Sequence, residues 1–222
     1  MISRMQVHNR LQQGLTLIEL MIVLGMLLVI VAMFYPSVAH KARVGSRSSK
    51  LGCVNNLKQV GLSYRTWALD NNDRFPMETP GTNGGTAEIV EFAAAYLHFQ
   101  VLSNELSTPK ILLCPTDVQR KRATNFWPDL SNSKISYFVG IAASETNVQM
   151  FLSGDRNITN GTSTKGGFLD LTTNHLAGWD HQLHRGQGNI GLADGSVMQM
   201  STEMLQKAIQ NTGDSTNRLA MP

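Results

Sequence analysis

The sequence predicts an α+β fold, with a long N-terminal helix packed on a small antiparallel β-sheet and a loop-rich C-terminal region. Three observations favour this fold. Residues 15–35 form an apolar run with a single charge, Glu19. Apolar side chains then recur at helical spacing as far as Trp67. Near the C-terminus, Asp194-Gly195 separates two strand-like segments, as in a β-hairpin.

The apolar run is long enough to cross a membrane. Its 21 residues, coiled as a helix, cover a hydrocarbon core of about 30 Å. A carboxylate within such a run costs roughly 2.5–3.5 kcal/mol on insertion, so Glu19 requires a partner or a function. We predict that residues 15–36 form a membrane-spanning helix, the first half of the long N-terminal helix.

The helix is predicted to continue beyond the apolar run. Pro36 removes a backbone donor and kinks a helix without necessarily ending it. A polar stretch at 70–73, followed by Pro76, indicates a break. Residues 37–69 are thus expected to form an amphipathic continuation whose apolar stripe is buried in the core and is not a ligand site. The stripe has intervals of four, three, four and three residues and consists of Cys53, Leu57, Val60, Tyr64 and Trp67.

Residues 70–222 are expected to form one globular α+β body. Apolar spacing predicts a helix over 88–100, and residues 154–188, rich in Gly, Asn, Thr and Asp, are predicted to be loops. The hairpin is expected to have a two-residue turn that pairs Leu192 with Val197, and Ser201 is expected to cap a last short helix. The predicted strands cover residues 111–114, 135–141, 150–153, 189–193 and 196–200.

The charges are unevenly distributed. The formal net charge is +3, yet residues 70–222 carry 11 basic and 15 acidic side chains. The excess of basic side chains lies in residues 1–65, where Glu19 is the sole acid. Such a stem suits anionic lipid headgroups, nucleic acid or the acidic faces of neighbouring molecules. The basic stretch by itself does not discriminate among them.

The junction before the apolar run, Gly14-Leu15-Thr16-Leu17-Ile18-Glu19, closely resembles the cleavage site of type IV prepilins and type II secretion pseudopilins. The resemblance implies that prepilin peptidase removes the leader, residues 1–14, by cutting after Gly14 and then methylates the new amino terminus at Leu15. It also implies that Glu19 takes part in filament assembly. Leu15 departs from the phenylalanine with which many type IV pilins begin.

Two other interpretations of the N-terminus stay open, an ordinary secretory signal and an uncleaved anchor. Ser37-Val38-Ala39 offers a signal-peptidase site. Against ordinary secretion, the run exceeds the usual apolar core of about 7–15 residues and carries Glu19 near its start. Basic residues on both sides leave the positive-inside rule weakly in favour of a cytoplasmic body, whereas the prepilin resemblance places the body outside.

Short motifs further along the chain indicate a narrower family that this sequence resembles. Asn55-Asn56-Leu57-Lys58-Gln59 follows Cys53 closely, the polar stretch from Asp70 leads to Pro76, and Cys114-Pro115-Thr116-Asp117 comes later. His184 is then followed, after nine intervening residues, by Asp194-Gly195. In this order the strings resemble prepilin-like proteins with a His-x9-Asp-Gly signature.

The resemblance implies a structural role, as a major or minor subunit of a type II secretion-like pseudopilus or a type IV pilus-like filament, and not an enzyme. The expected partners are prepilin peptidase, identical or related subunits, the inner membrane and the secretion or pilus assembly machinery; nucleic acid is not expected. The precursor would cross the bacterial inner membrane once, with its body in the periplasm, before it enters a pseudopilus or cell-surface filament. The alternatives are a minor tip subunit that binds DNA or secreted cargo, and a membrane-anchored exported binding protein.

Side chains that suggest zinc binding or catalysis have simpler explanations. Asp180, His181, His184 and Asp194 offer metal ligands, but no His-Glu-x-x-His string occurs. Ser196 lacks the Gly-x-Ser-x-Gly context of a nucleophile elbow. We interpret His184 as a structural residue that bonds Asp194 or nearby backbone at the hairpin base, and we predict no catalytic residue.

Calcium is the better candidate for an ion, although no cofactor is firmly predicted. The major pseudopilin of type II secretion, which this chain resembles, binds calcium in its C-terminal loops. The EF-hand pattern fails here because Phe75 occupies the glycine position. Turn-forming acids and amides also explain the candidate residues without a metal. These candidates offer the oxygen ligands that calcium prefers, and they are Asp70, Asn72, Asp73, Asp155 and Asn157.

The two cysteines, Cys53 and Cys114, are candidates for a disulfide. Cys53 falls on the apolar stripe and Cys114 ends a predicted buried strand, so the two side chains can meet between helix and sheet. An exported body would lie in a compartment that permits the bond. The alternative is a pair of unlinked buried thiols that behave as small apolar side chains.

Overall fold

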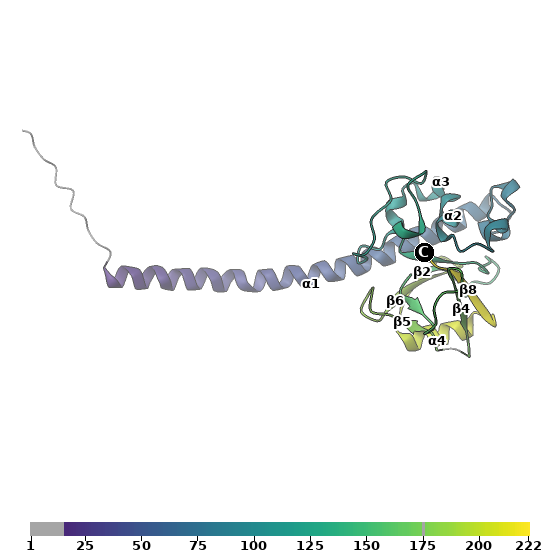
Figure 1. The fold of residues 1–222 in the computed structure, drawn as a ribbon. Helices are drawn as coiled ribbons and strands as arrows, with labels where there is room; N and C mark the ends of the chain where they lie inside the picture. Colours follow the sequence, from purple (N-terminus) through teal and green to yellow (C-terminus); the bar gives the residue numbers. More distant parts are fainter. Residues whose placement is uncertain (1–15, 175) are drawn as a thin grey trace, which may run out of the picture. The chain divides into compact units, whose positions relative to one another are not determined.

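The computed structural model describes the backbone of residues 16–174 and 176–222, and the side chains of the same residues except 34–49. The predicted leader, residues 1–14, and the predicted methylation site, Leu15, therefore lie outside the described residues. The chain divides into two units, Met1–Ser46 and Arg47–Pro222. Figure 1 shows the ribbon. Its helices and strands are α1 (Leu17–Leu69), α2 (Ala95–Gln100), α3 (Ser103–Leu106), β1 (Tyr137–Gly140), β2 (Phe151–Asp155), β3 (Ile158–Thr159), β4 (Phe168–Thr172), β5 (Gly178–Trp179), β6 (Gly188–Leu192), β7 (Val197–Met200), α4 (Thr202–Asn211) and β8 (Thr216–Ala220).

The polar stretch after Leu69 ends α1. The Asn71 side chain donates to the Trp67 carbonyl at 2.8 Å. The backbone N–H of Asp73 donates to the Ala68 carbonyl at 2.9 Å, and Asp73 has a φ of 54°. A left-handed residue and side-chain donors that satisfy the last carbonyls are the usual devices of a helix C-terminus. The polar stretch that predicted a break after Leu69 therefore caps the C-terminus of α1.

The body-side half of α1 buries the predicted apolar stripe. Cys53, Val60 and Tyr64 are fully buried, and Trp67 is only 7% exposed. The ring of Tyr64 meets those of Phe75 and Phe99 edge to face, with centroids 5.8 and 6.2 Å apart. Such aromatic pairs add stability beyond the area that they bury. The stripe thus forms one wall of the main hydrophobic core, which also contains residues of α2, β1 and β2.

A six-stranded antiparallel sheet, in the order β4-β8-β1-β2-β6-β7, separates this core from a second one. Along β1, Tyr137 and Val139 belong to the core shared with α1, whereas Phe138 belongs to the second core. In the second core, Leu205 and Ile209 of α4 pack against the sheet. Helix α2 packs on β1 from the other side, in the main core. Figure 1 shows α4 on the side of the sheet away from α1. The predicted α+β fold, a pilin-like architecture of one long helix and an antiparallel sheet, is confirmed.

The helix predicted over residues 88–100 is confirmed only in its second part, α2. The amide nitrogen of Asn132 donates to the Ala93 carbonyl at 3.0 Å, and its oxygen accepts from the Tyr96 N–H at 3.2 Å. A continuous helix would need the Ala93 carbonyl for the N–H four residues later. Because a distant side chain takes that acceptor, the segment before α2 stays irregular apart from one 3₁₀ turn, Ala87–Ile89.

The strand predicted over residues 111–114 is wrong. The segment forms a 3₁₀ turn, Pro109–Leu112, whose N-cap Thr108 accepts from the Lys110 N–H at 3.4 Å. Proline at the first position of a helical turn favours this start, since its fixed φ suits the turn and no N–H is lost. Leu112 and Cys114 are nevertheless buried, so the apolar run correctly indicated burial but not conformation.

The loop predicted over residues 154–188 contains three strands, β3, β4 and β5. Strand β4 pairs along its whole length with β8, from Phe168 opposite Ala220 to Thr172 opposite Thr216. No strand was predicted at β8. The outward side chains Asp170 and Arg218 form an ion pair at 2.8 Å, and polar residues of this kind hide the short apolar alternation of both strands.

The C-terminal hairpin, β6 and β7, is confirmed, but its predicted register is wrong. Val197 pairs with Gly191 rather than with Leu192, and the Leu192 N–H donates to the Ser196 carbonyl at 2.9 Å. The loop therefore has three residues and ends at Gly195, which has a φ of 83°. This geometry is common in three-residue hairpin loops, where a left-handed residue closes the turn. Helix α4 follows as predicted, and the Ser201 hydroxyl accepts from the Met204 N–H at 3.3 Å.

His98 is a buried histidine on α2. It is fully buried, and its Nδ1 lies 2.8 Å from the Thr86 hydroxyl oxygen. Nε2 has no hydrogen-bond partner among the described residues. Burial lowers the pKa of His98 from 6.5 to about 4, because the charged imidazolium loses its hydration in the core.

This burial predicts a pH-dependent loss of stability. As the pH falls from 6.5 to about 4, the unfolded chain takes up a proton on His98 that the folded chain does not, so the free energy of unfolding should drop. The shift corresponds to roughly 3 kcal/mol. Denaturant midpoints of the full-length protein measured across this range test the prediction. A His98→Gln variant should lose this part of the pH dependence and His181→Gln should retain it; equal slopes for wild type and His98→Gln would contradict it.

Candidate functional site

The start of α1 is closed by a capping box between Thr16 and Glu19. The Thr16 N–H and the Thr16 hydroxyl each donate to Glu19 Oε2 at 2.9 Å, and the Glu19 N–H donates back to the Thr16 hydroxyl oxygen at 3.4 Å. This reciprocal arrangement satisfies donors that the first helical turn leaves unpaired. Glu19, predicted as the assembly residue, is exposed. In this chain its carboxylate therefore has a partner within its own first turn.

The first part of α1, residues 17–33, exposes its apolar side chains on every face. All residues from 16 to 33 are exposed, with Leu17 at 77%, Leu28 at 69% and Met33 at 74%. Among the described residues, no helix combines the length and the hydropathy required of a membrane span. A contiguous apolar surface of this kind marks an interaction site, because covering it is favourable by about 25 cal/mol per Å².

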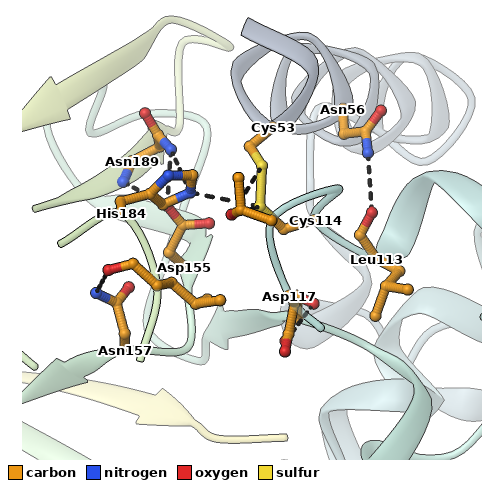
Figure 2. The surroundings of a disulfide bond; sticks show 12 residues. Cys53, Asn56, Leu113, Cys114, Asp117, Asp155, Asn157, His184 and Asn189 are labelled. Atoms are coloured by element: carbon orange, nitrogen blue, oxygen red, sulfur yellow. Dashed lines mark hydrogen bonds and ion pairs between the residues drawn. A yellow bond between two sulfur atoms is a disulfide. The ribbon is translucent and has the colours of Figure 1, made fainter. Parts of the chain in front are cut away.

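A disulfide joins Cys53 of α1 to Cys114. The Cα atoms are 4.9 Å apart, and the bond links residues separated by 61 positions. One turn further along α1, the Asn56 side chain donates to the Leu113 carbonyl at 3.1 Å, as Figure 2 shows. From the sequence, this disulfide was one of two possibilities, and a pair of unlinked buried thiols was the other. In the structure the segment at 113–114 is held to α1 by one covalent and one hydrogen bond.

His184 lies against this disulfide. Its Nε2 is 3.4 Å from the Cys114 sulfur, 3.2 Å from Asp155 Oδ2 and 3.3 Å from the Asn189 amide nitrogen (Figure 2). The side chains of His184 and Asp155 are completely buried, and the backbone and side-chain nitrogens of Asn189 both donate to Asp155 Oδ2 at 2.7 Å. The structure thus places Asp155 and Asn189 beside the imidazole, where sequence reasoning had offered Asp194 or backbone.

The loop that carries His184 is strained and firmly held. His184 and Arg185 have φ values of 50° and 57°, a left-handed conformation that costs roughly 1–3 kcal/mol for a residue other than glycine. The buried amide nitrogen of Asn157 lies within hydrogen-bond distance of three carbonyls of the same loop, at 2.9 to 3.1 Å. These acceptors belong to Asp180, Leu183 and Gln187. Contacts of this density keep the imidazole in place despite the strain.

The Asp194-Gly195 turn docks on α1 at the other end of the hairpin. Asp194 Oδ1 accepts from the Ser196 N–H at 2.8 Å, and the Asp194 carbonyl accepts from Arg65 Nη1 at 2.9 Å. A Cβ on Gly61 would come within 3.2 Å of the Gly195 Cα, so both glycines permit the close approach of turn and helix. The two ends of the His-x9-Asp-Gly string therefore hold the hairpin against α1, at the disulfide and at the turn.

A second buried acid, Asp117, lies beside the cluster and was not assigned a role from the sequence. Arg156 donates to both of its carboxylate oxygens, at 2.7 and 3.0 Å, and the Ser136 hydroxyl donates at 2.7 Å. Burial alone would raise the pKa of Asp117, but the bonds from Arg156 and Ser136 outweigh it and lower the pKa below its usual value. Asp117 closes the Cys-Pro-Thr-Asp string, which was the one sequence signal for it.

The calcium candidates do not gather around one point. Asp70 and Asp73 follow the end of α1, whereas Asp155 ends β2 and is committed to His184 and Asn189. Among the residues that the structure describes, three potential metal ligands lie close together in one place, at Cys53, Cys114 and His184. Calcium thus stays a prediction from the sequence, with no supporting cluster among the described residues.

Comparison with known families identifies one segment. Residues 9–35 match the prokaryotic N-terminal methylation motif. The matched segment includes the predicted cleavage junction, the capping box and the exposed apolar stretch of residues 17–33. The motif is of the prepilin type, which is the substrate of prepilin peptidase. The His-x9-Asp-Gly string lies outside the matched residues. No curated protein and no solved structure gives a significant match.

The disulfide predicts a large contribution to stability. A double variant, Cys53→Ser with Cys114→Ser, should lose about 4 kcal/mol of unfolding free energy in the chain-entropy model, because the bond restricts a long loop in the unfolded chain. Denaturant midpoints of the full-length protein in the presence of a chelator measure the difference. Reductant should bring the wild type close to the variant and leave the variant unchanged. A wild-type midpoint insensitive to reductant would contradict the prediction.

Proposed function

We propose that the chain is a structural, non-enzymatic subunit of a type IV pilus-like or type II secretion-like filament. The methylation motif over residues 9–35 carries the proposal. It coincides with a capped helix start, at Thr16 and Glu19, and with apolar side chains exposed as far as Met33. A helix of this kind requires a covering environment, which lipid supplies before assembly and neighbouring helices supply afterwards.

In this proposal the run from residue 15 to residue 36 crosses the inner membrane once, with residues 70–222 on the periplasmic side. The Cys53–Cys114 disulfide supports an extracytoplasmic body, because such bonds persist in oxidising compartments and are rare in the cytosol. Withdrawal of the helix from lipid into a bundle of identical or related helices then forms a pseudopilus or a surface filament.

Glu19 has a role in this assembly that depends on cleavage. The N–H and the hydroxyl of Thr16 both donate to Glu19 Oε2. Among the described residues, none donates a hydrogen bond to Glu19 Oε1. Cleavage after Gly14 creates a charged amine at Leu15, one residue before the cap. Pairing of Glu19 with the amine of a neighbouring subunit would compensate both charges in an apolar bundle, where an unpaired charge is costly. The pair would also fix the axial offset between adjacent helices.

Processing gives the first test of this function. The mature protein isolated from its native membrane should begin at Leu15, with or without an N-methyl group, because prepilin peptidase cuts after the glycine of the junction. Mass spectrometry of the N-terminal peptide reads this start directly. A mature start at His40 would instead establish cleavage after Ala39 and end the filament proposal.

Substitution of Glu19 tests the assembly step. A Glu19→Val subunit should be inserted and cleaved normally but excluded from filaments that contain wild-type subunits, because its neighbour's amine stays unpaired. Filaments sheared from cells that express both forms, analysed by mass spectrometry, measure the excluded fraction.

A Thr16→Ala variant is the matched control, since it loses the hydroxyl of the capping box and keeps the carboxylate. It should assemble with wild-type subunits. If Glu19→Val assembles normally, or if Thr16→Ala is excluded as strongly as Glu19→Val, then intersubunit charge pairing is wrong and helix capping is the role of Glu19.

A further inference from the structure

The disulfide and His184 together form a compact set of ligand atoms. The Sγ atoms of Cys53 and Cys114 and a ring nitrogen of His184 lie within 4.8 Å of one another, and all three residues are buried. Asp155 Oδ2 lies 3.2 Å from the same ring nitrogen, Nε2. We propose that the dithiol form of this protein binds a zinc ion through Cys53, Cys114, His184 and Asp155, so that a disulfide and a metal are alternative states of one site.

The distances agree with a tetrahedral zinc site. Zinc bonds are about 2.0 Å to nitrogen or oxygen and about 2.3 Å to sulfur. At the tetrahedral angle, they place a nitrogen and an oxygen ligand roughly 3.3 Å apart, and a nitrogen and a sulfur ligand roughly 3.5 Å apart. The corresponding separations in the structure are 3.2 Å between His184 Nε2 and Asp155, and 3.4 Å between Nε2 and the Cys114 sulfur. The two sulfurs, which are bonded in the oxidised form, must separate to roughly 3.8 Å. The imidazole and the carboxylate are therefore already at ligand spacing.

Hydrogen bonds from the surroundings orient two of these ligands, Asp155 and Cys114. Asn189 donates to Asp155 Oδ2 through two nitrogens at 2.7 Å, and the Thr116 hydroxyl oxygen lies 3.0 Å from the Cys114 sulfur. Hydrogen bonds of this kind fix ligand geometry and are as much a part of a site as the ligands. Asp155 Oδ1 is buried and has no partner among the described residues. A buried carboxylate oxygen without a partner is unfavourable, and a cation beside it removes that deficit.

The change between the two states balances. A phosphine reductant and one water molecule convert the disulfide into two thiols and leave as the phosphine oxide; a dithiol reductant does the same and is itself oxidised to a disulfide. Coordination of Zn²⁺ by both sulfurs then releases the two thiol protons. The link between α1 and the segment after Leu112 is kept, as a metal bridge in place of a sulfur–sulfur bond. This inference does not depend on the filament function.

The test compares oxidised and reduced full-length protein in detergent. After treatment with a phosphine reductant without oxygen, the protein is given zinc chloride and passed through a desalting column, and its metal content is measured. We expect about one zinc ion per reduced chain and none on the oxidised chain. Cobalt in place of zinc should give the absorption bands of tetrahedral coordination with thiolate ligands, which a site without the cysteines does not produce.

The variants assign the ligands. His184→Gln and Asp155→Asn should each weaken zinc binding by about tenfold or more, whereas His181→Gln, which changes an exposed histidine three residues away, should bind as the wild type does. Circular dichroism confirms that each variant is folded. The proposal is overturned if reduced wild type retains no zinc, if the oxidised protein binds zinc equally well, or if folded His184→Gln and Asp155→Asn bind with wild-type affinity.

Discussion

The burial of one face of α1 is the constraint from which the rest of the body follows. Cys53, Val60 and Tyr64 are removed from water along a single stripe, which fixes the rotation of the helix about its axis. Packing alone would still allow the stripe to slide by a turn, since apolar contacts are not directional. The disulfide at Cys53 prevents such sliding, because it admits one axial position only. The disulfide thereby fixes the axial position of α1 relative to the sheet and to the irregular segment before β1.

The hairpin depends on this register at both ends. His184 at its base contacts the disulfide, and Gly195 at its tip contacts Gly61 of α1, so a shift of the helix would disturb both contacts together. Buried ions add specificity to the arrangement. Asp155 is paired with His184 and Asp117 with Arg156, in each case between distant parts of the chain. A misplaced strand would leave a buried charge unpaired, at a cost of several kcal/mol.

The sequence predicted those features whose physics is local. Helical spacing identified the stripe from Cys53 to Trp67, and Asp194-Gly195 identified the hairpin. The strands β4 and β8 were missed because their pairing joins segments that are far apart in the sequence. No periodicity within residues 154–188 indicates that β4 has a partner at Thr216–Ala220. The interrupted helix before α2 has the same cause, a bond from Asn132. At the site, the sequence singled out His184, but its neighbour Asp155 was visible only as a generic oxygen ligand.

The position of the disulfide also decides how the body would respond to mechanical force. In a filament under tension, force would enter the body through α1 and leave it through the residues that follow Cys114. The disulfide transmits this force directly from Cys53 to Cys114. The segment between them is outside the load path and cannot be drawn out, although in extended form it would reach roughly 200 Å. Within the body, extension under load is thus restricted to the chain beyond Cys114. The aromatic packing around Tyr64 bears none of the load.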